Sequence, residues 1–135
     1  MRTMLKGKIH RARVTGVDID YEGSITIDSL LMKAADILPF EMVHVLDVNN
    51  GNRFQTYAIE GERGIGDIVI NGAAARLVSK GDTVILLTYH DVAEDEARFV
   101  KPRLVYVDEK NAIVRTSEKA GSLCRREECA LLSTG

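Results

Sequence analysis

Glycine-containing turns interrupt this chain at short intervals, and this pattern constrains its fold more than any other feature. Runs of β-branched and aromatic residues alternate with turn signals such as Asn49–Asn52 and Gly61–Gly66. Such side chains favour extended backbone, and an Asn-Gly pair favours the tight turn of a hairpin. Many short strands at regular spacing predict a mainly β protein, built as a small β-barrel.

One segment has the pattern of a substantial helix, from Ser29 to Leu38. Asp28 is placed to cap its first turn, its apolar residues recur at helical spacing, and Pro39 follows where a helix should stop. A shorter helical turn is expected over residues 73–78. The pattern therefore predicts a barrel with one or two short helices.

The chain has 135 residues, which fits one domain, and we expect this domain to span 1–116. The segment 117–135 lacks periodicity and is expected to be a flexible tail. A net charge of −2 without a basic stripe argues against nucleic-acid binding. No apolar run is long enough for a membrane span, and none follows the basic N-terminal residues as in a secretory signal. We therefore expect a cytoplasmic protein that binds neither nucleic acid nor membrane.

Both cysteines, Cys124 and Cys129, lie in the expected tail. Two cysteines separated by four residues do not supply the four ligands of a structural zinc site. They are therefore predicted to be free thiols in a reducing compartment, and no metal is expected.

The dipeptide Gly23-Ser24 interrupts the strand-like run from Tyr21 to Asp28. A glycine inside a strand weakens it, so a local bend is one explanation. The chemical alternative is that the Ser24 hydroxyl adds to the Gly23 carbonyl carbon and converts the peptide bond into an ester. Elimination would release the Gly23 carboxylate, and hydrolysis with loss of ammonia would leave a pyruvoyl group at position 24. Such a carbonyl forms imines with amines and draws in electrons, as a pyridoxal cofactor does.

Five motifs, in their order and spacing, resemble the pyruvoyl-dependent aspartate 1-decarboxylase family. The resemblance runs from Met1 to about Thr116, and its motifs are RTMLKGKIHRARVT, YEGSITID, NGNRFQTYAI, GERG and INGAAA. It implies a lyase that converts L-aspartate to β-alanine and CO2 through a Schiff base, for pantothenate synthesis. It also implies a six-stranded double-psi β-barrel, assembled as a homotetramer with active sites between subunits.

The resemblance implies a processed chain with its own carbonyl cofactor. Ser24 would become the pyruvoyl group, and cleavage would separate a β chain, 1–23, from an α chain, 24–135. No metal and no pyridoxal phosphate would be needed. Some members of the family use a separate maturation factor, so one is a possible partner here.

The resemblance gives roles to three further residues near the cleavage point. Tyr57 matches the proton donor that acts after CO2 leaves, which suits a phenol of tunable pKa. Thr56 matches the residue that supports self-cleavage by hydrogen bonding near the Gly23 carbonyl. Tyr21 matches a tyrosine beside the cleavage point. From the residues alone, Tyr57 and Thr56 are equally well explained as ordinary strand residues.

Arg53 and Lys8 match the cations that bind the substrate. Aspartate carries two carboxylates, for which arginine offers a bidentate fork and lysine a compact point charge. Both residues could instead be solvated strand residues. Lys6 and His10 lie on the same side of an alternating strand as Lys8 and compete for its role. Which carboxylate meets which cation is left open.

The motif INGAAA supplies the remaining expected pocket residues. Asn71 matches a polar residue of the pocket, and the backbone of Gly72, Ala73 and Ala74 would approach the substrate closely. An Asn-Gly turn and a run of helix-forming alanines explain the same residues without a site. Two further histidines, His44 and His90, are interpreted as structural.

Three alternatives to an aspartate decarboxylase stay open at this point. One is a pyruvoyl decarboxylase of another amino acid, although a neutral or basic substrate would not need the pair Arg53 and Lys8. Another is a double-psi barrel that binds a partner and catalyses nothing. The third is a precursor that stays uncleaved and inactive.

Overall fold

The structure is a computed structural model, and it describes residues 1–118. Within this range the chain forms nine strands, one α-helix and two short 3-10 helices. Their bounds are β1 Arg2–Arg13, β2 Gly16–Asp18, β3 Ser24–Asp28, α1 Ser29–Ala35, β4 Met42–Asp47, β5 Arg53–Gly61, β6 Ile68–Asn71, η1 Gly72–Arg76, β7 Thr83–Val92, η2 Ala97–Phe99, β8 Arg103–Val107 and β9 Ile113–Ser117. The mainly β class predicted from the sequence is confirmed.

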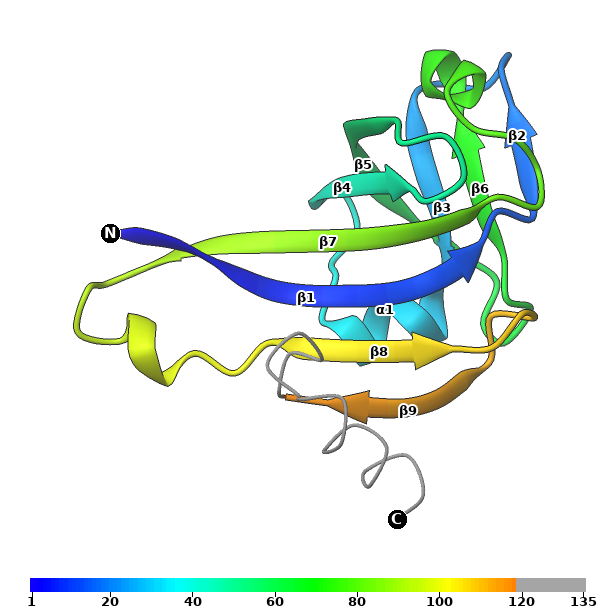
Figure 1. The fold of residues 1–135 in the computed structure, drawn as a ribbon. Coiled ribbons are helices and arrows are strands. Elements are labelled where there is room, and N and C mark those ends of the chain that lie inside the picture. The colour runs from blue at the N-terminus through cyan, green and yellow to red at the C-terminus, as the bar shows by residue number, and fades with distance from the viewer. Residues whose placement is uncertain (119–135) are drawn as a thin grey trace.

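The strands form one sheet that closes on itself as a barrel (Figure 1). Its order is β2-β6-β3-β5-β4-β7-β1-β8-β9. The ring closes because β1 runs on into β2 through Val14 and Thr15. The Val14 amide donates to the Asp82 carbonyl just before β7, whereas the Thr15 amide donates to the Ile68 carbonyl at the start of β6. If β1 and β2 are counted as one strand, the ring has six strands.

The prediction of six strands matches the ring but is wrong for the described part of the chain, which holds nine. A two-residue break separates β2 from β1, and the hairpin of β8 and β9 lies outside the ring. β8 pairs in parallel with β1, and β9 extends the sheet from β8. The hairpin signal at the Glu109–Asn111 turn is visible in the sequence, but its attachment to β1 is a tertiary fact.

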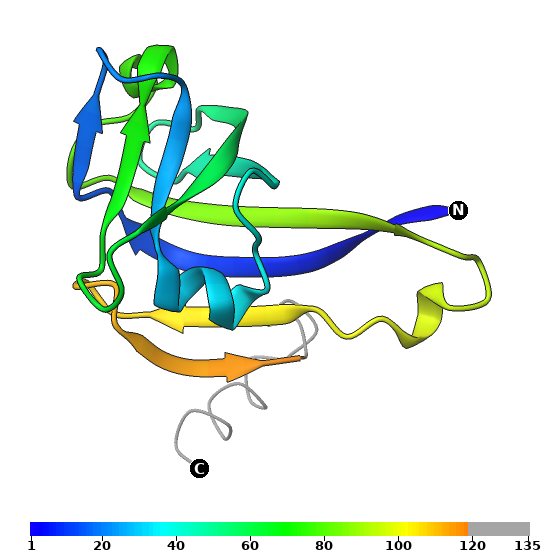
Figure 2. The ribbon, with the colours of Figure 1, turned by 180° about the vertical axis from the view of Figure 1, so that it is seen from behind.

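α1 begins where the sequence predicts, after its cap Asp28. The Asp28 carboxylate accepts a hydrogen bond from the Leu30 amide at 2.8 Å, and it also accepts from the amides of Gly64 and Gly66. The helix ends at Ala35, earlier than expected, because Asp36 takes the left-handed conformation with φ 58°. α1 packs against β8, β1 and β3 at one end of the barrel (Figure 2).

The inward faces of the ring strands bury one hydrophobic core. Its most deeply buried residues include Ile9, Ile25, Ile27, Val43, Val45, Ala58, Ile68, Ile70 and Leu86, all with no exposed area. Because side chains alternate along a strand, the odd-numbered residues of β3 face this core and the even-numbered ones face away. Ser24, an even-numbered residue, is therefore on the face of β3 that points away from the core.

The two long strands β1 and β7 leave the barrel together. Their antiparallel register runs from Arg13 paired with Thr83 to Arg2 paired with Val92, with two irregularities. Figure 1 shows the N-terminal end of β1, and the η2 segment that follows β7, projecting away from the ring. At the opposite side, η1 and the start of β3 lie at the end of the barrel remote from α1 (Figures 1 and 2).

Of the tail expected over 117–135, the structure describes Ser117, which ends β9, and Glu118. The rest of it lies outside the described residues, and so do Cys124 and Cys129. No helix within residues 1–118 is long and apolar enough to cross a membrane.

The side chain of Asn111 links the hairpin of β8 and β9 to the ring by hydrogen bonds. Asn111 is 2% exposed, with φ 63°, and its carbonyl oxygen accepts from the Arg13 amide at 2.7 Å. Its amide group donates to the carbonyls of Arg13, at 2.9 Å, and Gly66, at 2.7 Å. One side chain thus joins the end of β1, the loop before β6 and the turn between β8 and β9.

Replacement of Asn111 by alanine should lower the free energy of unfolding. Each polar group left buried and unpaired costs about 1–3 kcal/mol. The matched variant Asn111→Gly removes the whole side chain but keeps the left-handed backbone at low cost. Urea unfolding measures both, and an Asn111→Gly variant as stable as the original chain would contradict this role for the side chain.

Candidate active site

Ser24 lies at the first position of β3, fully buried. It pairs with Asn71 at the end of β6. The Asn71 side-chain amide donates to Ser24 Oγ at 2.9 Å, and Ser24 Oγ donates a long hydrogen bond of 3.4 Å to the Glu22 carbonyl. The serine hydroxyl is therefore held from one side by an amide and from the other by the backbone that leads into it.

The backbone of Gly72 approaches Gly23 too closely for any side chain. A Cβ built on Gly72 would lie 2.7 Å from Gly23 Cα, 2.8 Å from Gly23 N and 3.2 Å from the Tyr21 carbonyl oxygen. Gly72 also has φ 73°, a backbone conformation that residues with a side chain rarely adopt. Only glycine fits here. The approach places the start of η1 against the backbone of Gly23, the residue before Ser24.

β5 brings Tyr57 and Thr56 to the same end of the barrel. β3 and β5 are parallel, with Ile25 opposite Ala58. One residue earlier in each strand, this register sets Tyr57 beside Ser24, and alternation directs both away from the core. Thr56 precedes Tyr57 on β5, where it is opposite Val43 of β4. The Tyr57 ring contacts the Phe40 ring, with 6.3 Å between centroids.

Arg53 lies on the same face of β5 as Tyr57 but farther along the strand. Four residues separate them, which is roughly 13 Å in an extended strand. Arg53 is exposed and borders a groove of about 430 Å³ on the outer face of β4 and β7. The other residues of the groove are Thr3, Met42, His44, Tyr89, His90 and Asp91.

Lys8 lies on β1, which does not pair with β3. In the closed ring, β6 lies between β3 and the member formed by β1 and β2 on one side, and β5, β4 and β7 lie between them on the other. Lys8 is half-buried, and this burial lowers the pKa of its ammonium group below the usual lysine range. No carboxylate within residues 1–118 lies within ion-pair distance of it.

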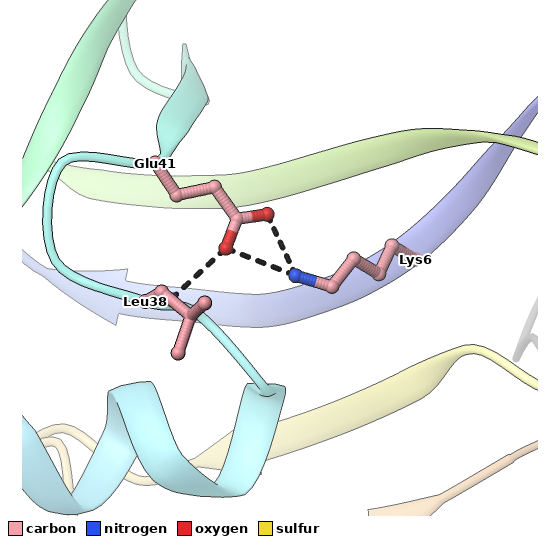
Figure 3. A network of polar contacts seen from close by, with 3 residues as sticks. All are labelled: Lys6, Leu38 and Glu41. Carbon is pink, nitrogen blue, oxygen red and sulfur yellow. Dashed lines mark hydrogen bonds and ion pairs between the residues drawn. The ribbon is translucent and has the colours of Figure 1, made fainter.

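The competing cation Lys6 is already paired, as Figure 3 shows. Its ammonium group contacts both carboxylate oxygens of Glu41, at 2.9 and 2.7 Å, and Glu41 also accepts from the Leu38 amide at 2.9 Å. The two side chains are only 18% and 21% exposed. Of the two lysines, Lys8 is therefore the one with a charge left for an anionic ligand.

His10 also lacks the charge that a carboxylate site needs. Burial, together with the positive charges of Lys8, Arg11 and Arg115, lowers the pKa of its imidazole. It makes an edge-to-face contact with Tyr106, at 5.6 Å between centroids. It is therefore neutral at neutral pH.

The two histidines interpreted as structural differ in their surroundings. His44 makes an edge-to-face contact with Tyr89 at 5.0 Å. His90 has a buried Nε2 atom without a hydrogen-bond partner in the described part of the chain. Both border the groove next to Arg53.

Tyr21 reaches the site by its backbone. Its side chain is 53% exposed, while its carbonyl oxygen faces Gly72. Sequence reasoning missed Thr26, whose Oγ1 accepts a hydrogen bond of 3.0 Å from the Asn71 amide. Its position two residues after Ser24, on the same face of a strand, is the signal that could have identified it.

No group of three or more metal-ligating side chains gathers anywhere in residues 1–118. The polar groups at the start of β3 are hydroxyls, an amide and backbone carbonyls. Such neutral groups suit a reaction of the chain itself and the binding of a small polar molecule more than they suit a divalent cation.

Comparison with known proteins identifies relatives along nearly the whole described chain. The model of the family described as aspartate decarboxylase matches residues 1–114. Aspartate 1-decarboxylase of Syntrophotalea carbinolica is 61% identical over 88% of this chain and 89% of its own. Aspartate 1-decarboxylase of Acetivibrio thermocellus is 54% identical over 90% of this chain and 98% of its own.

The similarity to solved structures is more distant. The rationally designed mkDPBB_sym1 protein is 20% identical, with a TM-score of 0.42, and the match covers 63% of this chain and 96% of the design. The designed mkDPBB_sym_86 protein is 16% identical, with a TM-score of 0.43, over 65% of this chain and 96% of its own.

Substitution of Gly72 by alanine should displace the backbone around Gly23. The new Cβ would overlap Gly23. The positive φ adds strain, because a residue with a Cβ pays about 1–2 kcal/mol for the left-handed conformation. Gly51→Ala is the matched control, because Gly51 has φ 78° and open space around its Cα. The melting temperature should fall further for Gly72→Ala than for Gly51→Ala. Equal losses would show that the close approach to Gly23 is absent.

Proposed function

The chain belongs to the aspartate decarboxylase family, and from this premise we propose that it converts L-aspartate to β-alanine and CO2, in the cytoplasm and for pantothenate synthesis. We propose further that it cleaves itself between Gly23 and Ser24 and carries a pyruvoyl group made from Ser24. The observation that carries the proposal is the buried Ser24 hydroxyl, held by Asn71 immediately after a glycine that Gly72 touches.

Self-cleavage begins with an acyl shift. Ser24 Oγ bonds to the Gly23 carbonyl carbon, the bond from that carbon to the Ser24 nitrogen breaks, and the hydroxyl proton moves to the nitrogen. The Asn71 amide stabilises negative charge on Oγ as its proton leaves. Thr56 is proposed to act at the Gly23 carbonyl. Elimination then frees the Gly23 carboxylate, and addition of water with loss of ammonia completes the new carbonyl.

The residues around Ser24 fit a small carbonyl group that needs neutral hydrogen-bond donors. When present, the pyruvoyl group supplies a carbonyl that captures the substrate amine and accepts electrons as CO2 leaves. Tyr57 holds a phenolic proton beside position 24 and donates it to the substrate carbon. Asn71 and the backbone of Gly72, Ala73 and Ala74 line the other side, with Tyr21 at the edge.

Arg53 and Lys8 bind the two carboxylates of aspartate, with the assignment between them left open. Within one chain they lie on β1 and β5, two strands that do not pair with each other, and β1 does not pair with β3 either. We therefore propose that the complete site forms between subunits of a homotetramer. The outer sheet face that carries Arg53 exposes Met42 by 55% and Tyr89 by 38%, and apolar surface of this kind is typical of an interface.

Intact mass spectrometry tests the proposed processing. Incubation of the purified chain should give two fragments that separate between Gly23 and Ser24. The larger should be lighter, by one ammonia, than a chain that begins with serine. The variant Ser24→Ala should stay whole. Addition of a candidate maturation factor distinguishes assisted from unaided cleavage, and a chain that stays whole under both conditions would contradict the proposal.

An assay with aspartate and with neutral and basic amino acids then tests the substrate. Release of CO2 from aspartate alone is expected, because the two cations need two carboxylates. Equal activity on a neutral amino acid would favour the alternative decarboxylase.

The lowered pKa of Lys8 should affect how KM for aspartate depends on pH on the alkaline side of neutrality. Burial lowers this pKa, so the ammonium group loses its proton, and its charge, at a lower pH than an ordinary lysine. KM for aspartate should therefore rise with increasing pH below the usual lysine range. Lys8→Arg should move this rise to higher pH, because arginine stays charged. An identical pH profile for Lys8→Arg would exclude Lys8 as the group responsible.

A further inference from the structure

We propose that Thr26 is a positioning residue for the chemistry at Ser24, which it controls through the side chain of Asn71. This inference rests on the proposed self-cleavage. The two hydroxyls, of Ser24 and Thr26, lie on the same face of β3 and flank a single amide group. Asn71 Nδ2 is 2.9 Å from Ser24 Oγ and 3.0 Å from Thr26 Oγ1.

The amide of Asn71 needs a second contact to stay aimed at Ser24. The last torsion of an asparagine side chain is broad and only weakly restrained by its own bonds. Its nitrogen carries two hydrogens, and with Thr26 as acceptor of one, the other is directed at Ser24 Oγ. Asn71 is 3% exposed, so water has little access to replace either contact. The hydroxyl of Thr26 therefore sets the direction in which Asn71 donates.

Gly61 on the neighbouring strand β5 accommodates the Thr26 side chain. A Cβ built on Gly61 would lie 3.1 Å from Thr26 Cγ2, so the absence of a side chain at Gly61 leaves room for the threonine methyl group. A β-branched side chain is stiff about its first torsion. With the methyl group against Gly61, the hydroxyl of Thr26 faces Asn71. The chain of contacts thus runs from Gly61 through Thr26 and Asn71 to Ser24.

This arrangement affects the step in which Ser24 Oγ loses its proton. An N–H group aimed at the oxygen stabilises the charge that develops there, and its effect depends on direction. Thr26 has a plain structural explanation as a β-former in a central strand, between Ile59 and Val69. The two explanations differ in whether the hydroxyl or the shape of the side chain matters.

Thr26→Val and Thr26→Ser separate these explanations. Valine keeps the shape and the methyl group against Gly61 but cannot accept a hydrogen bond, whereas serine keeps the hydroxyl and loses the methyl group. The rate of cleavage after Gly23, followed by intact mass, should fall about tenfold in Thr26→Val, the kinetic equivalent of one lost hydrogen bond. Thr26→Ser should stay within about threefold of the original chain, since its hydroxyl can still accept the bond.

Thr116→Val is the matched control, because Thr116 is exposed on β9 and its hydroxyl has no partner among residues 1–118. It should cleave at the original rate. Melting temperatures of all three variants check that each is folded. Equal slowing in Thr26→Val and Thr26→Ser would show that packing matters and would overturn the proposal, and so would an unchanged rate in Thr26→Val.

A double-mutant cycle shows whether Thr26 acts through Asn71. In an Asn71→Ala background, Thr26→Val should cause no further slowing, since the amide that it positions is gone. A further tenfold loss in that background would mean that Thr26 acts by another route and would overturn the proposal.

A measurement without cleavage keeps the two proposals distinguishable. In the uncleavable Ser24→Ala chain, NMR can follow exchange of the Asn71 side-chain amide hydrogens with water. Exchange should be faster in Ser24→Ala/Thr26→Val than in Ser24→Ala. If the original chain never cleaves, the proposed function fails while this comparison still decides the Thr26 contact. If the chain cleaves and exchange is the same in both variants, the inference fails alone.

Discussion

The placement of β3 between β5 and β6 is the constraint on which the site depends. β3 pairs in parallel with β5 and antiparallel with β6, so its first residue meets the end of one neighbour and the middle of the other. Hydrogen bonding on both sides leaves the strand no freedom to slip, because a shift of one residue would turn its buried face outward. Ser24 is therefore held between Asn71 and Tyr57 by the backbone ladder, before any side chain makes a specific contact.

The electrostatics of the molecule complement this arrangement. The groups around Ser24 are neutral, which suits the proposed reaction of its hydroxyl. The cations proposed to bind the substrate, Arg53 and Lys8, lie elsewhere, and Lys6, the competing lysine, is paired with Glu41. This separation is the reason for the proposal that a second chain completes the site.

Local features were predictable from the sequence, and long-range ones were not. The helix after β3 was predicted with its cap at Asp28, because capping and periodicity are local. The hairpin that turns at Glu109–Asn111 was also predictable, because its turn is local. Its place outside the six-membered ring was not, because the pairing of β8 with β1 joins residues distant in sequence. Thr26 was missed for a similar reason, since its partner Asn71 follows it by 45 residues.

The sequence alone determined the family and the mainly β class, because these follow from local propensities and from motifs in a fixed order, and it singled out Gly23-Ser24 as the proposed cleavage point. Only the tertiary structure decided that Lys8 is free while Lys6 is paired and that Gly72 must lack a side chain. It also decided that one amide serves both Ser24 and Thr26. Each of these depends on which atoms the closed barrel brings within a few ångströms, and a linear pattern does not contain that information.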